Sequence, residues 1–326
     1  MRVLAGDVGG TKTRLALMEP GEGFLRVRAE AEYPSADYAG LAEAAQAFLS
    51  GQTEAVDAAA FGLPGPVVAD QVRTTNLPWT VAAEELRRAL GIRTVALLND
   101  LEATAYGIGE LDPADVEVLA EGDPRAGGNA ALIAPGTGLG EAGLFWDGAR
   151  HRPFATEGGH ADFAPADETD AALHAHLAEQ FGHVSWERVL SGPGLTNVHA
   201  FLRTYRDKAV PNWLAREVDT GDAPAAISRA AEARSCPVCA EAMDRFVRYF
   251  GAEAGNLGLA FMATGGVYLG GGIPPRIAGR LLEPDFLEAF RAKGRMRELM
   301  ERMPVRLIRN DRAALLGAAR RAALEV

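Results

Sequence analysis

The stretch GDVGGTKTRLAL, residues 6–17, places an acid, two glycines and a threonine between two short apolar runs. The apolar runs predict two strands of a β-hairpin, because glycines favour a tight reversal between them. Glycines also let backbone N–H groups approach phosphate oxygens that a larger side chain would hold off. The candidate phosphate-binding residues are Gly6, Asp7, Val8, Gly9, Gly10 and Thr11.

Asp7 lies where the first predicted strand meets this loop. Mg²⁺ prefers few carboxylates and keeps most of its waters, so one acid beside a phosphate site suits it. We expect Asp7 to hold Mg²⁺ through water. The alternative is that Asp7 only forms the turn, as aspartate often does.

A second stretch, APGTGLGEAGLFWDG at 134–148, repeats the order of strand, glycine loop and strand. Residues 138–143 match GxGxxG, but that fingerprint indicates a dinucleotide site only where a strand leads into a helix. A P-loop is excluded because none of the three lysines follows the required glycine pattern. We expect Gly136, Thr137 and Gly138 to clamp the phosphates of a nucleotide together with the first loop.

Composition narrows the class of protein. The 326 residues allow two domains, and 48% hydrophobic with 24% charged residues is typical of a globular chain. A net charge of −11 argues against a nucleic-acid partner. No apolar run reaches the ~18 residues of a membrane span, and the N-terminal run is too short for a signal peptide. We therefore expect a cytoplasmic protein with no membrane partner.

The two cysteines, Cys236 and Cys239, stand in the sequence CPVC. Zinc usually takes about four ligands, and neither a second cysteine pair nor clustered histidines follow at zinc-finger spacing. A redox pair is expected beside a βαβ entry, which this segment lacks. The cysteines are therefore predicted to be structural or incidental.

The order of predicted elements favours an α/β protein. Apolar runs predict strands at 24–33, 57–67 and 94–100, and helical spacing predicts helices at 38–51, 82–91, 167–182, 240–265 and 310–326. Strands alternate with helices in both halves of the chain. No low-complexity linker separates the halves, so we expect two domains packed against each other across a cleft.

Asn99 and Asp100 end the apolar run TVALL abruptly. Polar groups at the end of a strand in an open α/β sheet lie where ligands tend to bind. A carboxylate there can accept the proton of a hydroxyl that attacks a phosphoryl group. The alternative role, a cap on the helix that follows, is compatible with it, since one residue can cap while the other reacts.

Together these segments resemble the bacterial glucokinases. The matching segments are DVGGT at 7–11 with Arg14, LLNDLEATAYGI at 97–108, APGTGLG at 134–140, EGGH at 157–160, ERVLSGPGL at 187–195 and GGVYLGGGIPPR at 265–276. The resemblance implies two ribonuclease H-like domains of the hexokinase, actin and heat-shock-chaperone ATPase superfamily, flanking a cleft. It implies a smaller domain of 1–108 with 309–326, a larger domain of 109–308, and a homodimer. The segment directly after EGGH, residues 161–168, contains no cysteine, and within the resemblance this implies the zinc-free branch.

The same resemblance implies the activity and the site. The activity is ATP-dependent, Mg²⁺-assisted phosphorylation of glucose at its 6-hydroxyl, with Asp100 as general base. The implied sugar ligands are Asn99, Asp100, Glu157, His160 and Glu187. Gly265 and Gly271 are the candidates for the adenosine side, although glycines there can equally serve helix–strand packing. The turn NLPW at 76–79 is a weaker candidate for the edge of the sugar site, and His174 and His176 are expected to be solvated.

Two other functions fit part of the pattern. A kinase for another hexose or an amino sugar would use the same residues, and a sugar-sensing regulator would use the same pocket without turnover. No helix-turn-helix segment precedes the first loop, which argues against a DNA-binding repressor. An actin-like ATPase without a sugar site is disfavoured by the residues Asp100, Glu157 and Glu187.

Overall fold

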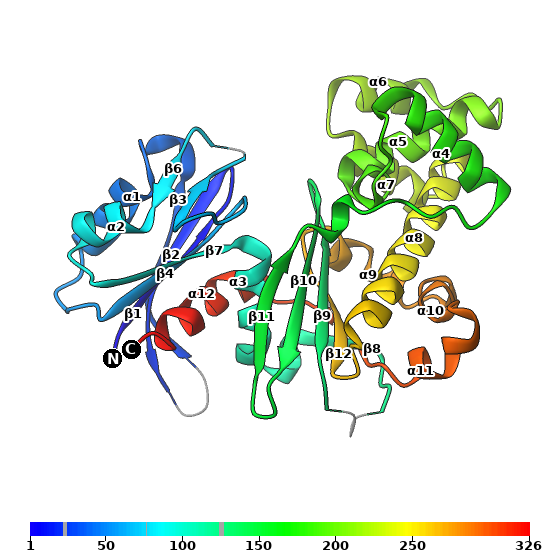
Figure 1. The fold of residues 1–326 in the computed structure, drawn as a ribbon. Helices are drawn as coiled ribbons and strands as arrows, with labels where there is room; N and C mark the ends of the chain where they lie inside the picture. The colour runs from blue at the N-terminus through cyan, green and yellow to red at the C-terminus, as the bar shows by residue number, and fades with distance from the viewer. Residues whose placement is uncertain (22–24, 76, 124–126) are drawn as a thin grey trace. The chain divides into compact units, whose positions relative to one another are not determined.

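The computed structural model describes residues 1–21, 25–75, 77–123 and 127–326 (Figure 1). The chain forms two compact units. The first comprises Met1–Val116, Ala142–Ala155 and Ile308–Val326, and the second comprises Glu117–Glu141 and Thr156–Leu307. Strands alternate with helices along the chain, so the predicted α/β class is confirmed. The division at residues 108 and 309 remains a prediction for the domain boundaries.

The first unit is built on a five-stranded sheet with the order β3-β2-β1-β4-β7. Strands β1 to β3 are antiparallel neighbours, whereas β4 and β7 run parallel to β1. The predicted hairpin is confirmed, because β1 and β2 pair from Val3↔Met18 to Val8↔Thr13. The bounds are β1 Val3–Val8, β2 Lys12–Pro20, β3 Leu25–Pro34, β4 Ala58–Leu63 and β7 Thr94–Asn99. Residue 24 of the predicted third strand and residue 76 of the NLPW turn lie outside the described residues.

Side chains of β1 alternate between two apolar layers. Leu4 and Val8 pack in a cluster with residues of α1 and α2, whereas Val3 and Ala5 pack with residues of α12. The layer against α12 consists largely of alanines, which lets the helix approach the sheet closely. Figure 1 shows α12, the last helix of the chain, along the sheet beside α3. The helices of this unit are α1 Leu41–Leu49, α2 Ala83–Leu90, α3 Asp100–Gly107 and α12 Ala313–Ala323, with a small hairpin of β5 Gln71–Arg73 and β6 Thr80–Ala82.

The second sheet has the strand order β11-β10-β9-β12-β13-β8, in which β12 runs parallel to β9 and β13. Its strands are β8 Val116–Ala120, β9 Ala130–Pro135, β10 Leu139–Trp146, β11 His151–Thr156, β12 Gly266–Leu269 and β13 Val305–Ile308. The helices of the second unit are α4 Glu168–Phe181, α5 Gly192–Tyr205, α6 Asn212–Thr220, α7 Ala223–Glu232, α8 Pro237–Phe261, α9 Ala278–Leu281, α10 Pro284–Arg291 and α11 Arg297–Glu301. One large apolar core joins these helices to β9, β12 and β13.

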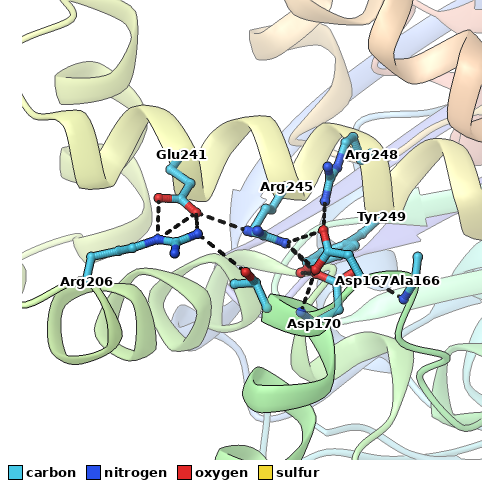
Figure 2. A network of polar contacts seen from close by, with 9 residues as sticks. Ala166, Asp167, Asp170, Arg206, Glu241, Arg245, Arg248 and Tyr249 are labelled. Atoms are coloured by element: carbon cyan, nitrogen blue, oxygen red, sulfur yellow. Dashed lines mark hydrogen bonds and ion pairs between the residues drawn. The ribbon is translucent and has the colours of Figure 1, made fainter.

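A buried ionic network ties α4 to α8 in the second unit (Figure 2). Arg245 donates to Asp170 at 2.6 Å, and the Tyr249 hydroxyl donates to the same Asp170 oxygen at 2.6 Å. Asp170 exposes 1% of its surface, so these charged hydrogen bonds offset the cost of burying its carboxylate. Asp167, the N-cap of α4, also accepts from Arg245 and from Arg248. The network therefore fixes where α4 begins.

The element predictions hold with small shifts at the ends. The predicted helix at 240–265 is longer at its start, because α8 already begins at Pro237. Residues 138–143 lie across the start of the strand β10 and do not lead into a helix, which agrees with the expectation that they are not a dinucleotide-binding loop.

The expectation that His174 and His176 are solvated was wrong, since both are half-buried and contact Phe163 and Phe201 respectively. Across the described residues, the helices include none with both the length and the apolar character needed to cross a bilayer.

The close packing of α12 on α3 gives a stability test. A Cβ at Gly317 would overlap the Ala103 carbonyl oxygen, although alanine is normally the better helix former by about 0.5–1 kcal/mol. We expect Gly317→Ala to lower the free energy of unfolding by about 2 kcal/mol or more, because backbone cannot move aside cheaply. Gly109→Ala is the matched control, since a Cβ there meets open space. Urea unfolding measures both, and a Gly317→Ala protein as stable as the wild type would contradict the packing argument.

Candidate active site

Two carboxylates lie at the carboxyl edge of the parallel strands in the first unit. Asp7 of β1 pairs with Gly62 of β4, and Asn99 of β7 pairs with Leu63 of the same strand. A Cβ at Gly62 would lie 3.8 Å from the Asp100 Cα, so only a glycine stands between the two acids. The predicted Asp7 and Asp100 are therefore brought together from segments far apart in the sequence.

The electrostatics of Asp7 reflect this neighbour. The pKa of Asp7 is raised to about 6, mainly by burial, then by the charge of Asp100, and to a smaller extent by the charge of Asp311. The Arg14 guanidinium lowers the pKa of Asp7 but does not cancel these effects. An excess of negative charge gathered in a half-buried position is an arrangement that a cation would stabilise.

Asn99, rather than Asp100, caps the helix α3, which begins at Asp100. Its Oδ1 accepts from the Leu101 N–H at 2.9 Å, which makes Asn99 the N-cap of α3, and its Nδ2 donates to the Gly65 carbonyl. Asp100 stands in the first turn and accepts from the same N–H at 2.9 Å. Because Asn99 already caps the helix, Asp100 is not needed for that purpose.

The first glycine loop has a support that the sequence did not reveal. The Gly9 N–H bonds the Lys12 carbonyl at 2.8 Å, which closes the turn and leaves Gly10 and Thr11 at its tip. The Ser35 hydroxyl donates to the Gly9 carbonyl at 2.9 Å, and the Ser35 N–H bonds the Thr11 carbonyl at 2.9 Å. Ser35 thus holds the loop from behind, a role that no local pattern around Ser35 indicates.

Gly6 and Val8 differ from the other loop candidates. Val8 is 2% exposed in the apolar core, and a Cβ at Gly6 would overlap the ring of Phe61. Both residues belong to β1, which pairs with strands on both sides. Phosphate binding by these two residues remains a prediction. Their packing alone explains why position 6 is a glycine and position 8 is apolar.

In the second unit, the second glycine loop is tied to Glu187. The Glu187 carboxylate accepts from the Leu139 N–H at 2.9 Å, and a Cβ at Gly138 would come within 2.6 Å of it. The Gly136 carbonyl accepts from the Gly192 N–H at 2.8 Å, which joins the loop to the start of α5. Gly138 thus lies directly beside the predicted sugar ligand Glu187, whose carboxylate would have to shift to admit a side chain there, and Thr137 at the tip is exposed.

The predicted sugar turn at 157–160 packs on the same strand. A Cβ at Gly159 would overlap the Leu139 carbonyl, so the two glycines let the turn lie directly on β10. Glu157 and His160, which flank them, are both exposed. The Trp186 N–H bonds the Ala161 carbonyl at 3.0 Å, which holds this turn beside the Glu187 segment. Glu157, His160 and Glu187 are therefore gathered around the start of β10.

Beneath this turn lies a buried acid, Glu141, whose role the sequence did not predict. Glu141 of β10 is 2% exposed, and a Cβ at Gly158 would overlap its Oε2. The charge that acts on it is that of Glu253 of α8, which is 4% exposed and accepts from Asn256 at 2.7 Å. Burial and then the charge of Glu253 raise the pKa of Glu141, and burial raises that of Glu253 despite nearby Lys293. The sequence feature that could have identified Glu141 is its position as the one acid inside the apolar run LGEAGLFW at 139–146.

The two glycines expected on the adenosine side are not brought together. Gly271 follows the carboxyl end of β12, with a φ of +87° and the Pro135 carbonyl 2.7 Å from where its Cβ would be. Gly265 precedes the other end of β12, where a Cβ would meet the Gly128 carbonyl at 2.5 Å. Close backbone packing accounts for Gly265, so its contact with adenosine rests on the resemblance alone.

Comparison with known proteins gives the family. A family model described as Glucokinase matches residues 4–325. A protein named glucokinase from Aromatoleum aromaticum is 42% identical over 319 residues, which cover 97% of this chain and 93% of that protein. The chain belongs to the glucokinase family.

Solved structures agree with this family assignment. A glucokinase from an Antarctic psychrotroph matches with a TM-score of 0.87 and 31% identity, covering 99% of both chains. A ROK family glucokinase from Streptomyces griseus, solved with glucose and AMPPNP, matches with a TM-score of 0.64 and 22% identity over 99% of this chain and all of that one. At 22% identity the second likeness shows the fold alone.

The buried pair predicts a pH-dependent stability. Because the folded pKa of Glu141 is raised, its contribution to stability is full below the ordinary glutamate pKa and is lost as pH rises through the raised value. We expect Glu141→Gln, which keeps the shape without the charge, to flatten the fall in unfolding free energy between about pH 5 and about pH 8.

Thermal unfolding across this pH range measures the effect. Exposed Glu179→Gln on α4 is the control and should follow the wild type. A Glu141→Gln protein with the wild-type pH profile would contradict the raised pKa of Glu141 in the folded state.

Proposed function

We propose that the chain transfers the γ-phosphoryl group of ATP to the 6-hydroxyl of glucose, with Asp100 as the general base. One observation carries the proposal: Asp100 and Asp7 meet at the carboxyl edge of β1, β4 and β7, where α/β proteins bind ligands. Asp100 would accept the hydroxyl proton as the oxygen attacks the phosphoryl group. The rigid strand end and the start of α3 hold it for that purpose.

Asp7 suits a cation rather than a sugar hydroxyl. Its pKa is raised by burial and then by the charges of Asp100 and Asp311, and the chain's own Arg14 does not offset these effects. We assign Asp7 to Mg²⁺, held through water. When bound, Mg²⁺ neutralises charge on the phosphate oxygens. The chain's own contribution is to hold the Asp7 carboxyl at a strand end, where a bound cation would offset the burial and the Asp100 charge that raise its pKa.

The remaining residues bind and orient the substrates. Glu157, His160 and Glu187 around the start of β10 are proposed to form hydrogen bonds with the sugar hydroxyls, and Asn99 at the end of β7 is proposed as a further sugar ligand. The N–H groups of the 9–11 and 136–138 loops are proposed to bind the phosphates, and Gly271 to leave room for the adenosine. The ribonuclease H-like arrangement of the two domains, the cytoplasmic location and the homodimer are part of this proposal.

A kinase for another hexose and a regulator without turnover remain the competing functions. Incubating the pure protein with Mg²⁺-ATP and a panel of sugars, and measuring ADP, separates them. Glucose should give the highest kcat/KM. A higher value with another hexose or an amino sugar would change the substrate, and sugar binding without ADP would favour the regulator.

Asp100→Asn tests the general base. Asparagine keeps the shape and one acceptor but cannot take the proton, so we expect turnover to fall by about 10²-fold or more. Glucose affinity should stay within about tenfold, since one hydrogen bond is retained. Steady-state kinetics and calorimetry on folded protein measure both. Asp112→Asn, which changes an exposed cap, is the matched control, and near-wild-type turnover of Asp100→Asn would remove Asp100 from the mechanism.

Asp7→Asn tests the metal assignment. We expect it to raise the Mg²⁺ and ATP concentrations needed for half-maximal rate, because the neutral amide is a poorer partner for hydrated Mg²⁺. Glucose binding without nucleotide should be almost unchanged in calorimetry. Loss of glucose binding instead would assign Asp7 to the sugar.

A further inference from the structure

Three soft-metal ligands meet in the core of the second unit. His199 lies on α5, Cys236 is the N-cap of α8, and Cys239 is in the first turn of α8. A ring nitrogen of His199 and the two Sγ atoms all lie within 4.8 Å of one another. None of the three residues is part of the candidate active site.

The histidine is the unusual member of this cluster. His199 exposes 1% of its surface, and its Nε2 is buried without a hydrogen-bond partner among the described residues. A buried polar atom left unpaired costs free energy, so such atoms are usually paired. A buried imidazole with an unpaired nitrogen, in a side chain that also approaches two thiols, is an arrangement that a metal ion would satisfy.

The start of α8 places a backbone donor and a helix N-terminus at the two cysteines, whereas burial raises the pKa of the Cys239 thiol. The Cys239 N–H points at the Cys236 Sγ at 3.5 Å, and the positive end of a 25-residue helix dipole lies at both residues. Cys236 exposes 1% and Cys239 none of its surface, so two uncompensated thiolates would be costly there. A divalent cation would remove that cost.

We propose that His199, Cys236 and Cys239 form a binding site for Zn²⁺. Two thiolates and Zn²⁺ sum to zero charge, which suits a buried site, whereas Cu(I) would leave a net negative charge. Ligand atoms at ~2.0–2.3 Å from zinc lie about 3.5–4 Å apart, so the side chains need to close by about 1 Å or less. Both cysteines are free, and each loses its thiol proton to solvent as the metal binds.

From the sequence, Cys236 and Cys239 were expected to be structural or incidental rather than metal ligands. The sequence shows two cysteines without clustered histidines nearby, because His199 stands 37 residues before Cys236 in the chain. The fold supplies it by packing α5 on α8. Three protein ligands leave one of the four zinc positions for a water or another small donor.

Cobalt titration of the full-length protein tests the site. Reduced, metal-free protein is titrated with Co²⁺ without oxygen and then with Zn²⁺, with Cu(I) in a parallel arm. We expect one ion per chain, a thiolate-to-cobalt absorption band, its loss on adding Zn²⁺, and a higher melting temperature with Zn²⁺. The chain has two cysteines in total, so such a band reports this site.

Variants identify the ligands. His199→Asn and Cys236→Ser should each weaken Zn²⁺ binding more than about 100-fold, since even residues outside the ligand set typically contribute 10–100-fold. His176→Asn changes a half-buried histidine on α4, outside the proposed ligand set; it is the control and should bind as the wild type does. If a variant does not fold, the wild-type cobalt spectrum decides.

Three results would overturn the proposal. They are a disulfide in the purified protein in place of two thiols, two titratable thiols with no cobalt band, and metal binding that survives both ligand substitutions. Tighter binding of Cu(I) with no uptake of Zn²⁺ would reject zinc as the ion.

Discussion

The carboxyl edge of three parallel strands is the constraint on which the candidate site depends. Strands β1, β4 and β7 pair in register, so Asp7 and Asp100 lie on either side of Gly62 although 92 residues separate them in the chain. A side chain in place of that glycine would press on Ala103 and on the first turn of α3. The closeness of two acids that raises the pKa of Asp7 is thus a consequence of sheet register, and a cation and a substrate proton are the partners that such a pair suits.

Both glycine loops are held by groups that are themselves partly or fully buried. Ser35 bonds the first loop from behind, and Glu187 accepts from the Leu139 N–H at the end of the second. The turn at 157–160 rests on β10 through two glycines, with the Glu141 carboxyl directly beneath. Supports of this kind keep backbone donors and side chains in place before substrate arrives, which lowers the entropy lost on binding.

Local sequence was sufficient for some features and insufficient for others. The hairpin, the existence of the main helices and the position of Asn99 and Asp100 follow from residue types within a few positions, so they could be predicted, whereas several helix ends differ by two to four residues. Ser35, the pair of Glu141 and Glu253, and the approach of His199 to the cysteines depend on contacts between distant segments, which no local pattern records. Gly265 could not be interpreted from the sequence for another reason. A glycine that allows close packing and a glycine that leaves room for a ligand are the same residue in a sequence.

The most direct test is the titration of Asp7 itself. The ¹³C chemical shift of its side-chain carboxyl, followed by NMR against pH, reports its pKa in the wild type and in Asp100→Asn. The account predicts a pKa of about 6 in the wild type and a lower value in the variant, because the second-largest cause of the rise is the charge of Asp100. A wild-type pKa near the ordinary aspartate value of 3.8, or one that does not change in the variant, would contradict the coupling of the two carboxylates across Gly62.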